Sequence, residues 1–175
     1  MKNVLVVIGH PFWEKSVANR GIVEALRSCG HNITFSNLKE LYPDGRLNVA
    51  EEQAKLLAAD IIVLQYPVMW FGAPSLMHRY FEEILTYGFA YGNGNYRLTG
   101  KPLIASFTTG AAETAYSGKG GEGYTMDEFI VPVAATATYC KMKWSGYVCS
   151  YGMMDPSSEA IENHAKRLSD KIAAL

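Results

Sequence analysis

The stretch that decides the fold is residues 3–19, Asn-Val-Leu-Val-Val-Ile-Gly-His-Pro-Phe-Trp-Glu-Lys-Ser-Val-Ala-Asn. It opens with a nearly continuous apolar run, which is typical of a strand covered on both faces, and it passes through a short loop into a helical pattern. His10, Ser16 and Asn19 place polar side chains in that loop. The first N–H groups of a helix lack intrahelical acceptors, and the helix dipole adds about half a positive charge there, so the stretch predicts a phosphate-binding loop.

Length and charge limit the class of protein. The chain has 175 residues, which predicts a single domain over 1–175. A net charge of −1 without any run of Lys and Arg argues against nucleic-acid binding. The first apolar run is too short for a signal sequence or a membrane span. Cys29, Cys140 and Cys149 are odd in number and irregularly spaced, so we expect reduced thiols and a cytoplasmic protein.

Apolar runs alternate with helical patterns along the chain. We expect strands at 4–8, 33–36, 61–66, 103–108 and 144–150. The helices are expected at 18–29, 49–59, 76–85 and 129–140, with a last one opened by Asp155-Pro156 and a bend at Pro132. Asn48 with Glu51, and Thr125 with Glu128, have capping-box spacing. The alternation predicts a doubly wound, flavodoxin-like α/β fold with a five-stranded parallel sheet in the order 2-1-3-4-5 and helices on both faces.

In such a sheet, a ligand is expected where the loops after strands 1, 3 and 4 meet, here residues 10–19, 67–74 and 108–122. The second loop contains two prolines and a run of N–H groups from Val68 to Phe71 beside large flat side chains. In the third loop, Gly110 allows the main chain to approach a ligand closely. A phosphate at one loop and a planar ring between the other two describe a flavin mononucleotide.

Several short motifs, taken together and in order, resemble the DT-diaphorase-like NAD(P)H:quinone oxidoreductases. The likeness is greatest to the short bacterial branch that includes the ancillary subunit of the glutathione-gated potassium-efflux system. It covers essentially the whole chain, and the matching residues are 9–11, 16–19, 65–67, 70–74, 88–92, 98–101 and 108–110.

The resemblance implies a role for each loop. The phosphate and ribityl loop would comprise His10, Ser16, Val17, Ala18 and Asn19. The loop along the isoalloxazine edge would comprise Pro67, Val68, Met69, Trp70 and Phe71, and the loop at the pyrimidine end Thr108, Thr109, Gly110 and Ala111. The implied cofactor is FMN, with FAD as the alternative because the longer relatives use it. The implied hydride donor is NADH or NADPH, and no metal site is expected.

The implied reaction is a ping-pong transfer, in which NAD(P)H gives a hydride to flavin N5 and a quinone then takes two electrons in the same pocket. Tyr116 matches a tyrosine that hydrogen-bonds near the flavin, whereas Glu122 stands where the longer relatives have a histidine. Tyr91 matches an aromatic residue that one subunit contributes to the substrate pocket of the other. The resemblance therefore implies a homodimer.

Other interpretations remain open at this point. The chain could be a regulatory flavoprotein that docks on a membrane transporter, which would place it at the inner face of the membrane. A phospho-receiver or an electron-carrier flavodoxin fits poorly, because the acidic residues of a receiver and the strongly acidic composition of a carrier are missing. His10 could simply cap a strand, Trp70 and Phe71 could be ordinary core or interface aromatics, and Glu122 could be a solvated loop charge.

Overall fold

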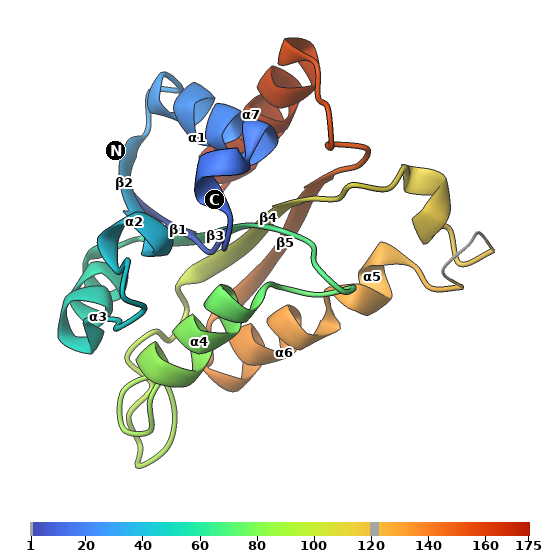
Figure 1. The fold of residues 1–175 in the computed structure, drawn as a ribbon. Helices are drawn as coiled ribbons and strands as arrows, with labels where there is room; N and C mark the ends of the chain where they lie inside the picture. The colour runs from blue at the N-terminus through green and yellow to red at the C-terminus, as the bar shows by residue number, and fades with distance from the viewer. Residues whose placement is uncertain (1, 120–122) are drawn as a thin grey trace.

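The computed structural model describes residues 2–119 and 123–175. Its centre is a parallel five-stranded sheet in the order β2-β1-β3-β4-β5 (Figure 1), which confirms the predicted topology. The strands are β1 (Asn3–Ile8), β2 (Asn32–Asn37), β3 (Ile61–Pro67), β4 (Pro102–Thr108) and β5 (Lys143–Ser150). All five expected strands are present, each extended by one or two residues.

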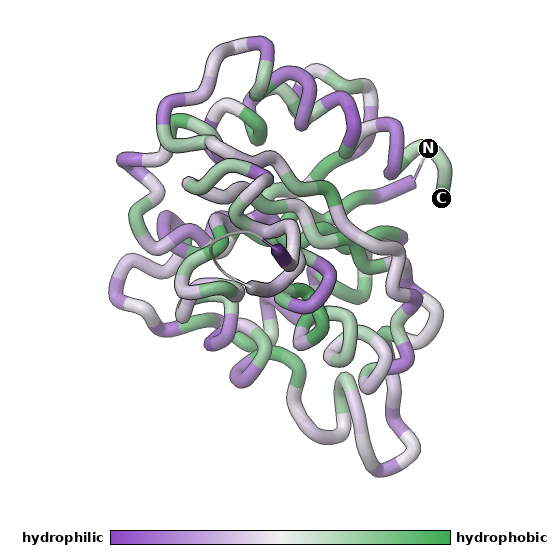
Figure 2. Tube along the Cα trace, turned by 90° about the vertical axis from the view of Figure 1, so that its right-hand side faces the viewer, coloured by the Kyte–Doolittle hydropathy of each residue, from purple (hydrophilic) through white to green (hydrophobic). Residues whose placement is uncertain are grey.

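Helices cover both faces of the sheet. One face carries α1 (Val17–Arg27) and α7 (Ser158–Ala173), and the other carries α3 (Val49–Ala58), α4 (Ser75–Ile84) and α6 (Val131–Tyr139) (Figure 1). Side chains alternate between the two cores, so Val4 and Val6 pack under α1 and α7 while Leu5 and Val7 pack on the other side. Figure 2 shows the apolar stretches running through the middle of the molecule and the polar ones mainly at its outside.

The expected helices match the observed ones to within two residues at each end, except at two places. Ser157, not Asp155, caps α7, and its side chain accepts a hydrogen bond from the Ala160 N–H. The predicted helix over 129–140 is two helices, α5 (Met126–Phe129) and α6, which part at Ile130. Pro132 lies in the first turn of α6, where its missing N–H costs nothing, so it starts a helix instead of bending one.

Three short elements have no counterpart in the sequence pattern. They are η1 (Trp13–Lys15), α2 (Leu38–Leu41) and η2 (Glu113–Tyr116), each too short to show a hydrophobic period. Over the described residues, no helix combines the length and the apolar character needed to cross a bilayer.

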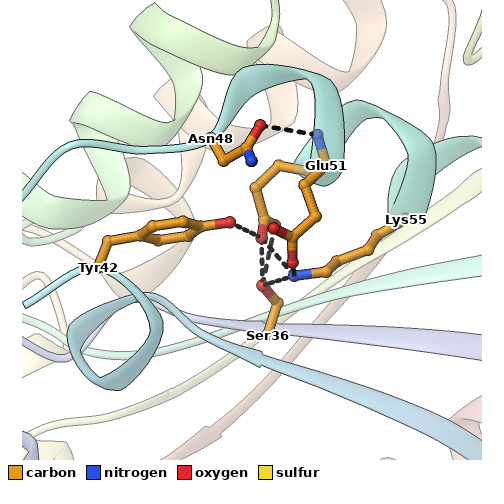
Figure 3. Close-up of polar contacts among 6 residues, drawn as sticks. Ser36, Tyr42, Asn48, Glu51 and Lys55 are labelled. Carbon is orange, nitrogen blue, oxygen red and sulfur yellow. Dashed lines mark hydrogen bonds and ion pairs between the residues drawn. The ribbon is translucent and has the colours of Figure 1, made fainter.

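A buried carboxylate joins α3 to the end of β2. Glu52 is completely buried, and it accepts hydrogen bonds from the hydroxyl groups of Ser36 and Tyr42 at 2.8 Å and from the Lys55 ammonium at 2.7 Å. Figure 3 shows Ser36, Tyr42 and Lys55 converging on this point. Lys55 also pairs with Glu51 at 2.8 Å. The group satisfies the buried charge and fixes α3 against the sheet.

Candidate functional site

The loops after β1, β3 and β4 meet at the carboxyl edge of the sheet, as the topology requires. The Gly9 N–H donates to the Gln65 carbonyl at 3.0 Å, which joins the first loop to β3. The Val68 N–H donates to the Thr108 carbonyl at 2.8 Å, which joins the second loop to the third. The structure therefore brings together the three segments in which the candidate site residues lie.

The start of α1 forms a cradle of hydrogen-bond donors, made by Ser16, Val17, Ala18, Asn19 and Thr108. The Ser16 hydroxyl oxygen caps the helix by accepting from the Asn19 N–H at 3.1 Å. The side-chain amide of Asn19 donates to the hydroxyl oxygens of Ser16 and Thr108 at 3.3 and 3.0 Å. Both hydroxyl protons are thus left for another acceptor, beside the Val17 and Ala18 N–H groups of the first helical turn.

His10 adds a further neutral donor. Its Nδ1 accepts from the Phe12 N–H at 3.1 Å, which leaves the ring proton on Nε2. Burial lowers the pKa of His10, and the nearby Glu14 carboxylate opposes this only in part. Within the described part of the chain, the Nε2–H has no acceptor.

The loop after β3 is a tight turn of unusual conformation. Met69 and Gly72 exchange two backbone hydrogen bonds, at 3.0 and 3.2 Å, around Trp70 (φ 48°) and Phe71 (φ 66°). Two successive positive φ angles at bulky residues are strained and are typical of functional loops. Trp70 is also 95% exposed. The expected run of four available N–H groups is shorter, because those of Val68 and Met69 are used internally and only those of Trp70 and Phe71 remain.

The loop after β4 is anchored by Thr109. Its N–H donates to the Ser150 carbonyl at 2.9 Å, and its hydroxyl donates to the Ala111 carbonyl at 2.8 Å. The N–H groups of Gly110 and Ala111 have no acceptor among the described residues. A Cβ on Gly110 would lie 3.0 Å from Met154 Sδ, so the glycine also permits close packing of this loop.

Aromatic rings from four segments stand beside these loops. Phe129 of α5 stacks with Phe71 at a centroid distance of 5.3 Å, packs edge to face with Tyr116 at 6.0 Å and lies tilted against Tyr124 at 5.8 Å. Tyr116, at the end of η2, also contacts Tyr151 at 5.6 Å. The structure thus places Tyr116 in an aromatic cluster next to the strained turn. Glu122 lies outside the described residues.

Tyr91 lies elsewhere, with α4 and α6. Its ring contacts Tyr87 at 5.9 Å and Tyr139 at 5.1 Å. Tyr91 and Tyr139 line an open, mainly apolar cavity of about 850 Å³ together with Phe81 and Leu85. Within its own chain, Tyr91 therefore belongs to a surface groove and not to the three-loop site.

Three buried polar residues that support the cradle were assigned no role from the sequence. Gln65 donates to the Asn19 amide oxygen at 2.8 Å, and Ser106 donates to Gln65 Oε1 at 2.6 Å. His164 of α7 contacts Ser106 at 2.8 Å. All three are fully buried. The sequence did contain a signal for two of them, because Gln65 and Ser106 stand inside otherwise apolar strands. A buried polar group needs a hydrogen-bond partner, so such positions indicate a buried polar contact.

Comparison with known proteins identifies the class. Residues 2–172 match the model of a family described as having a flavodoxin-like fold, and the chain belongs to that family. It is 36% identical to the uncharacterized NAD(P)H oxidoreductase YrkL of Bacillus subtilis, with 99% of each chain covered. It is 35% identical to the glutathione-regulated potassium-efflux system ancillary protein KefF of Klebsiella pneumoniae, over 81% of this chain and 78% of KefF.

Two solved structures extend the comparison. General stress protein 14 of Treponema denticola, in complex with FMN, superposes with a TM-score of 0.90 at 27% identity over the full length of both chains. An NADPH-quinone reductase of P. pentosaceus superposes with a TM-score of 0.85 at 26% identity, covering 97% of this chain and 96% of the other.

Proposed function

We propose that the protein is a flavin-dependent NAD(P)H:quinone oxidoreductase in which FMN occupies the three-loop site. The two substrates would use the same pocket in turn, as in a ping-pong reaction. FMN in the Treponema structure and the oxidoreductase names of the relatives support this assignment. FAD is the alternative, since a groove of about 530 Å³ beside Ser16 and Val17 leaves room next to the cradle.

The observation that carries the proposal is a set of donors without protein acceptors. In the described chain, the Ser16 and Thr108 hydroxyl protons stand at the cradle, and four N–H groups remain on the two neighbouring loops, from Trp70, Phe71, Gly110 and Ala111. Hydroxyl and helix N–H donors suit a phosphate. Paired N–H groups from two linked loops suit the carbonyl and nitrogen edges of a flat heterocycle.

The protein's part in the reaction follows from these groups. A bound flavin would supply the redox chemistry, accepting a hydride from NAD(P)H and delivering two electrons to a quinone. The Gly110 and Ala111 N–H groups would stabilise negative charge developing on the heterocycle. The Phe71, Tyr116 and Phe129 rings would exclude water and hold a flat substrate. Tyr116 would carry a proton or hydrogen bond at its hydroxyl, while the role of Glu122 stays a prediction from sequence.

We further propose that the protein acts as a homodimer through the groove between α4 and α6. Tyr139, which lines this mainly apolar cavity, is 64% exposed, and Tyr87, whose ring contacts Tyr91 of the cavity lining, is 67% exposed. Exposed aromatic side chains around an apolar cavity are characteristic of an interface. Tyr91 would then contact the substrate pocket of the partner subunit.

The test is to incubate the purified protein with FMN and with FAD, identify the retained cofactor by mass spectrometry, and measure NADH and NADPH oxidation with menadione. Flavin retention and quinone-dependent turnover are expected. Tyr116→Phe should retain flavin, since the ring contacts stay, but should slow turnover about tenfold or more. A protein that binds neither flavin and oxidises neither nucleotide is not this enzyme.

A second candidate function is favoured by the likeness to KefF, whose name describes an ancillary protein of a potassium-efflux system. In this alternative the chain would be a regulatory flavoprotein docked on a transporter at the inner face of the membrane. A pull-down with the transporter's cytoplasmic domain, with and without FMN, distinguishes the regulatory role from the enzymatic one. Specific binding would support the regulatory role, and turnover without binding would support the enzyme alone.

A further inference from the structure

A buried chain of hydrogen bonds connects the exposed side of α7 with the cradle. Arg167 donates to Ser150 Oγ at 2.7 Å, and Ser150 contacts His164 Nδ1 at 2.8 Å. His164 Nε2 contacts Ser106 at 2.8 Å, and from Ser106 the chain continues through Gln65 to Asn19. Asn19, Gln65, Ser106 and His164 are buried on the α1–α7 side of the sheet, whereas Arg167 is exposed.

The direction of this chain follows from its inner part and is reinforced at its outer end. Ser106 gives its one proton to Gln65 Oε1, so it accepts from His164 Nε2–H. Arg167 donates to Ser150 Oγ, and its positive charge there favours a Ser150 proton that points to His164 Nδ1 over a second donor at that oxygen. A neutral imidazole that accepts at Nδ1 carries its proton on Nε2. Burial and, to a smaller extent, the Arg167 charge lower the pKa of His164 to about 3, so the ring is neutral at pH 7.

The same order of donor and acceptor continues from His164 to the cradle. The His164 Nε2–H donates to Ser106, Ser106 donates to Gln65, Gln65 donates to Asn19, and the Asn19 amide donates to both cradle hydroxyls. With the other histidine tautomer, the two amide groups could turn over together, and Asn19 Oδ1 would accept the hydroxyl protons. The cradle would then present lone pairs to its ligand, and lone pairs repel an anion.

We propose that His164 is a positioning residue whose Nε2–H tautomer fixes the Ser16 and Thr108 hydroxyls as donors and thereby makes the cradle selective for a phosphate anion. The inference rests on the proposed flavin function and adds the means by which the phosphate is preferred. Arg167, on the exposed side of α7, favours this tautomer through Ser150.

The first test compares FMN with riboflavin, which lacks the phosphate. Ser106→Ala breaks the chain without touching the cradle. Its ratio of FMN affinity to riboflavin affinity should fall about tenfold, the worth of one charge-assisted hydrogen bond, while riboflavin affinity is unchanged. The matched control is Ser36→Ala, which removes an equally buried hydroxyl outside the chain and should preserve the ratio even if stability falls.

The second test needs no flavin. Nitrogen-15 NMR of the histidine side chains in the native apoprotein should show His164 protonated at Nε2 alone. Arg167→Met should yield a mixture of tautomers, whereas Arg167→Lys, which keeps a cationic donor, should preserve the native spectrum. Arg167 is exposed, so neither variant is expected to prevent folding.

The outcomes separate this proposal from the proposed function. Equal losses of FMN and riboflavin affinity in Ser106→Ala, or a native Nδ1–H tautomer, would overturn the positioning role even if the enzyme reduces quinones. If native protein binds neither flavin, the proposed function fails. Inorganic phosphate titrated into native protein and Ser106→Ala then decides the positioning role, through the amide shifts of Val17 and Ala18. Weaker phosphate binding in the variant supports the role, and equal binding contradicts it.

Discussion

The side chain of Glu52 holds α3 against the end of β2. Its carboxylate is fully buried but receives hydrogen bonds from Ser36, Tyr42 and Lys55 (Figure 3). Burial and the hydrogen bond to Glu52 raise the pKa of Tyr42, so that phenol remains a donor. For Lys55, burial acts to lower the pKa, but the bonds to Glu51 and Glu52 outweigh it and the pKa is raised.

Glu52→Gln should therefore lower the free energy of unfolding by about 2–3 kcal/mol, because Lys55 loses its buried partner and the donors lose a charged acceptor. The matched control is Glu51→Gln, which removes the half-exposed partner of the same lysine and should cost less than about 1 kcal/mol. Urea denaturation of both variants gives the comparison, and equal losses would contradict the assigned role of Glu52.

Trp70 and Phe71 both have positive φ angles, yet among the described residues only Phe71 has a ring contact, with Phe129. Trp70→Gly should leave the free energy of unfolding unchanged or raise it by up to about 1 kcal/mol, because strain is relieved and no packing is lost. Phe71→Gly relieves similar strain but loses the stacked pair, so it should be destabilised. The ranking is measured by chemical denaturation, and a Trp70 variant that is the less stable of the two would refute the strain argument.

Among the elements, α1 combines a structural cap with the proposed ligand contact. Ser16 caps α1 as Asn48 caps α3, each accepting from the N–H three residues on. Ser16→Ala and Asn48→Ala should each cost about 1 kcal/mol of stability. Only Ser16→Ala should also weaken FMN binding, by about tenfold, because only that hydroxyl belongs to the cradle. Thermal melts and flavin-fluorescence titrations test this, and parallel effects of the two variants on FMN would remove Ser16 from the site.

The elements also show what sequence patterns can and cannot predict. The strands and their order were predictable because apolar runs and alternation with helices leave few topologies. The three loops were predictable as a meeting place for the same reason. The use of the Val68 and Met69 N–H groups within the turn was not, because it depends on the positive φ values of Trp70 and Phe71. No local residue preference signals those values, since neither position is a glycine.

Contacts between segments that are distant in the sequence could not be predicted either. Gln65 and Ser106 become neighbours through the register of β3 with β4, and His164 reaches them only because α7 packs on that face. Their polar character inside apolar strands was visible, but their partners were not. The cradle residues close to one another in sequence were thus easier to predict than the residues that support them.

For the whole molecule, His164 predicts a pH dependence of stability. Its pKa is about 3 in the folded protein, below its ordinary value of 6.5, so between these values the unfolded chain binds a proton that the folded chain does not. This contribution to stability is complete above pH 6.5 and is lost as the pH falls toward 3, up to about 5 kcal/mol. The urea midpoint of His164→Gln should therefore fall less steeply between pH 6.5 and 3 than that of the native protein. An equally steep fall in both proteins would contradict this role of His164.

The proposed dimer is also tested on the whole molecule. Tyr139→Arg places a charge in the α4–α6 groove and should convert a dimer to a monomer in analytical ultracentrifugation, since a charge at the centre of an apolar interface is costly. Leu41→Arg, at an exposed position on α2, is the control and should leave the sedimentation of the native protein unchanged. A native protein that sediments as a monomer with bound flavin would show that the groove has another purpose.

The exposed indole of Trp70 has a practical consequence. Trp13 is buried and Trp144 is partly buried, whereas Trp70 is almost entirely in water, so the three indoles report on distinct surroundings. Fluorescence emission of an indole moves to longer wavelength in a polar environment, and the red edge of the spectrum therefore comes mainly from Trp70. Quenching or a blue shift confined to that edge would follow the arrival of a cofactor, a substrate or a second subunit in real time without any added label.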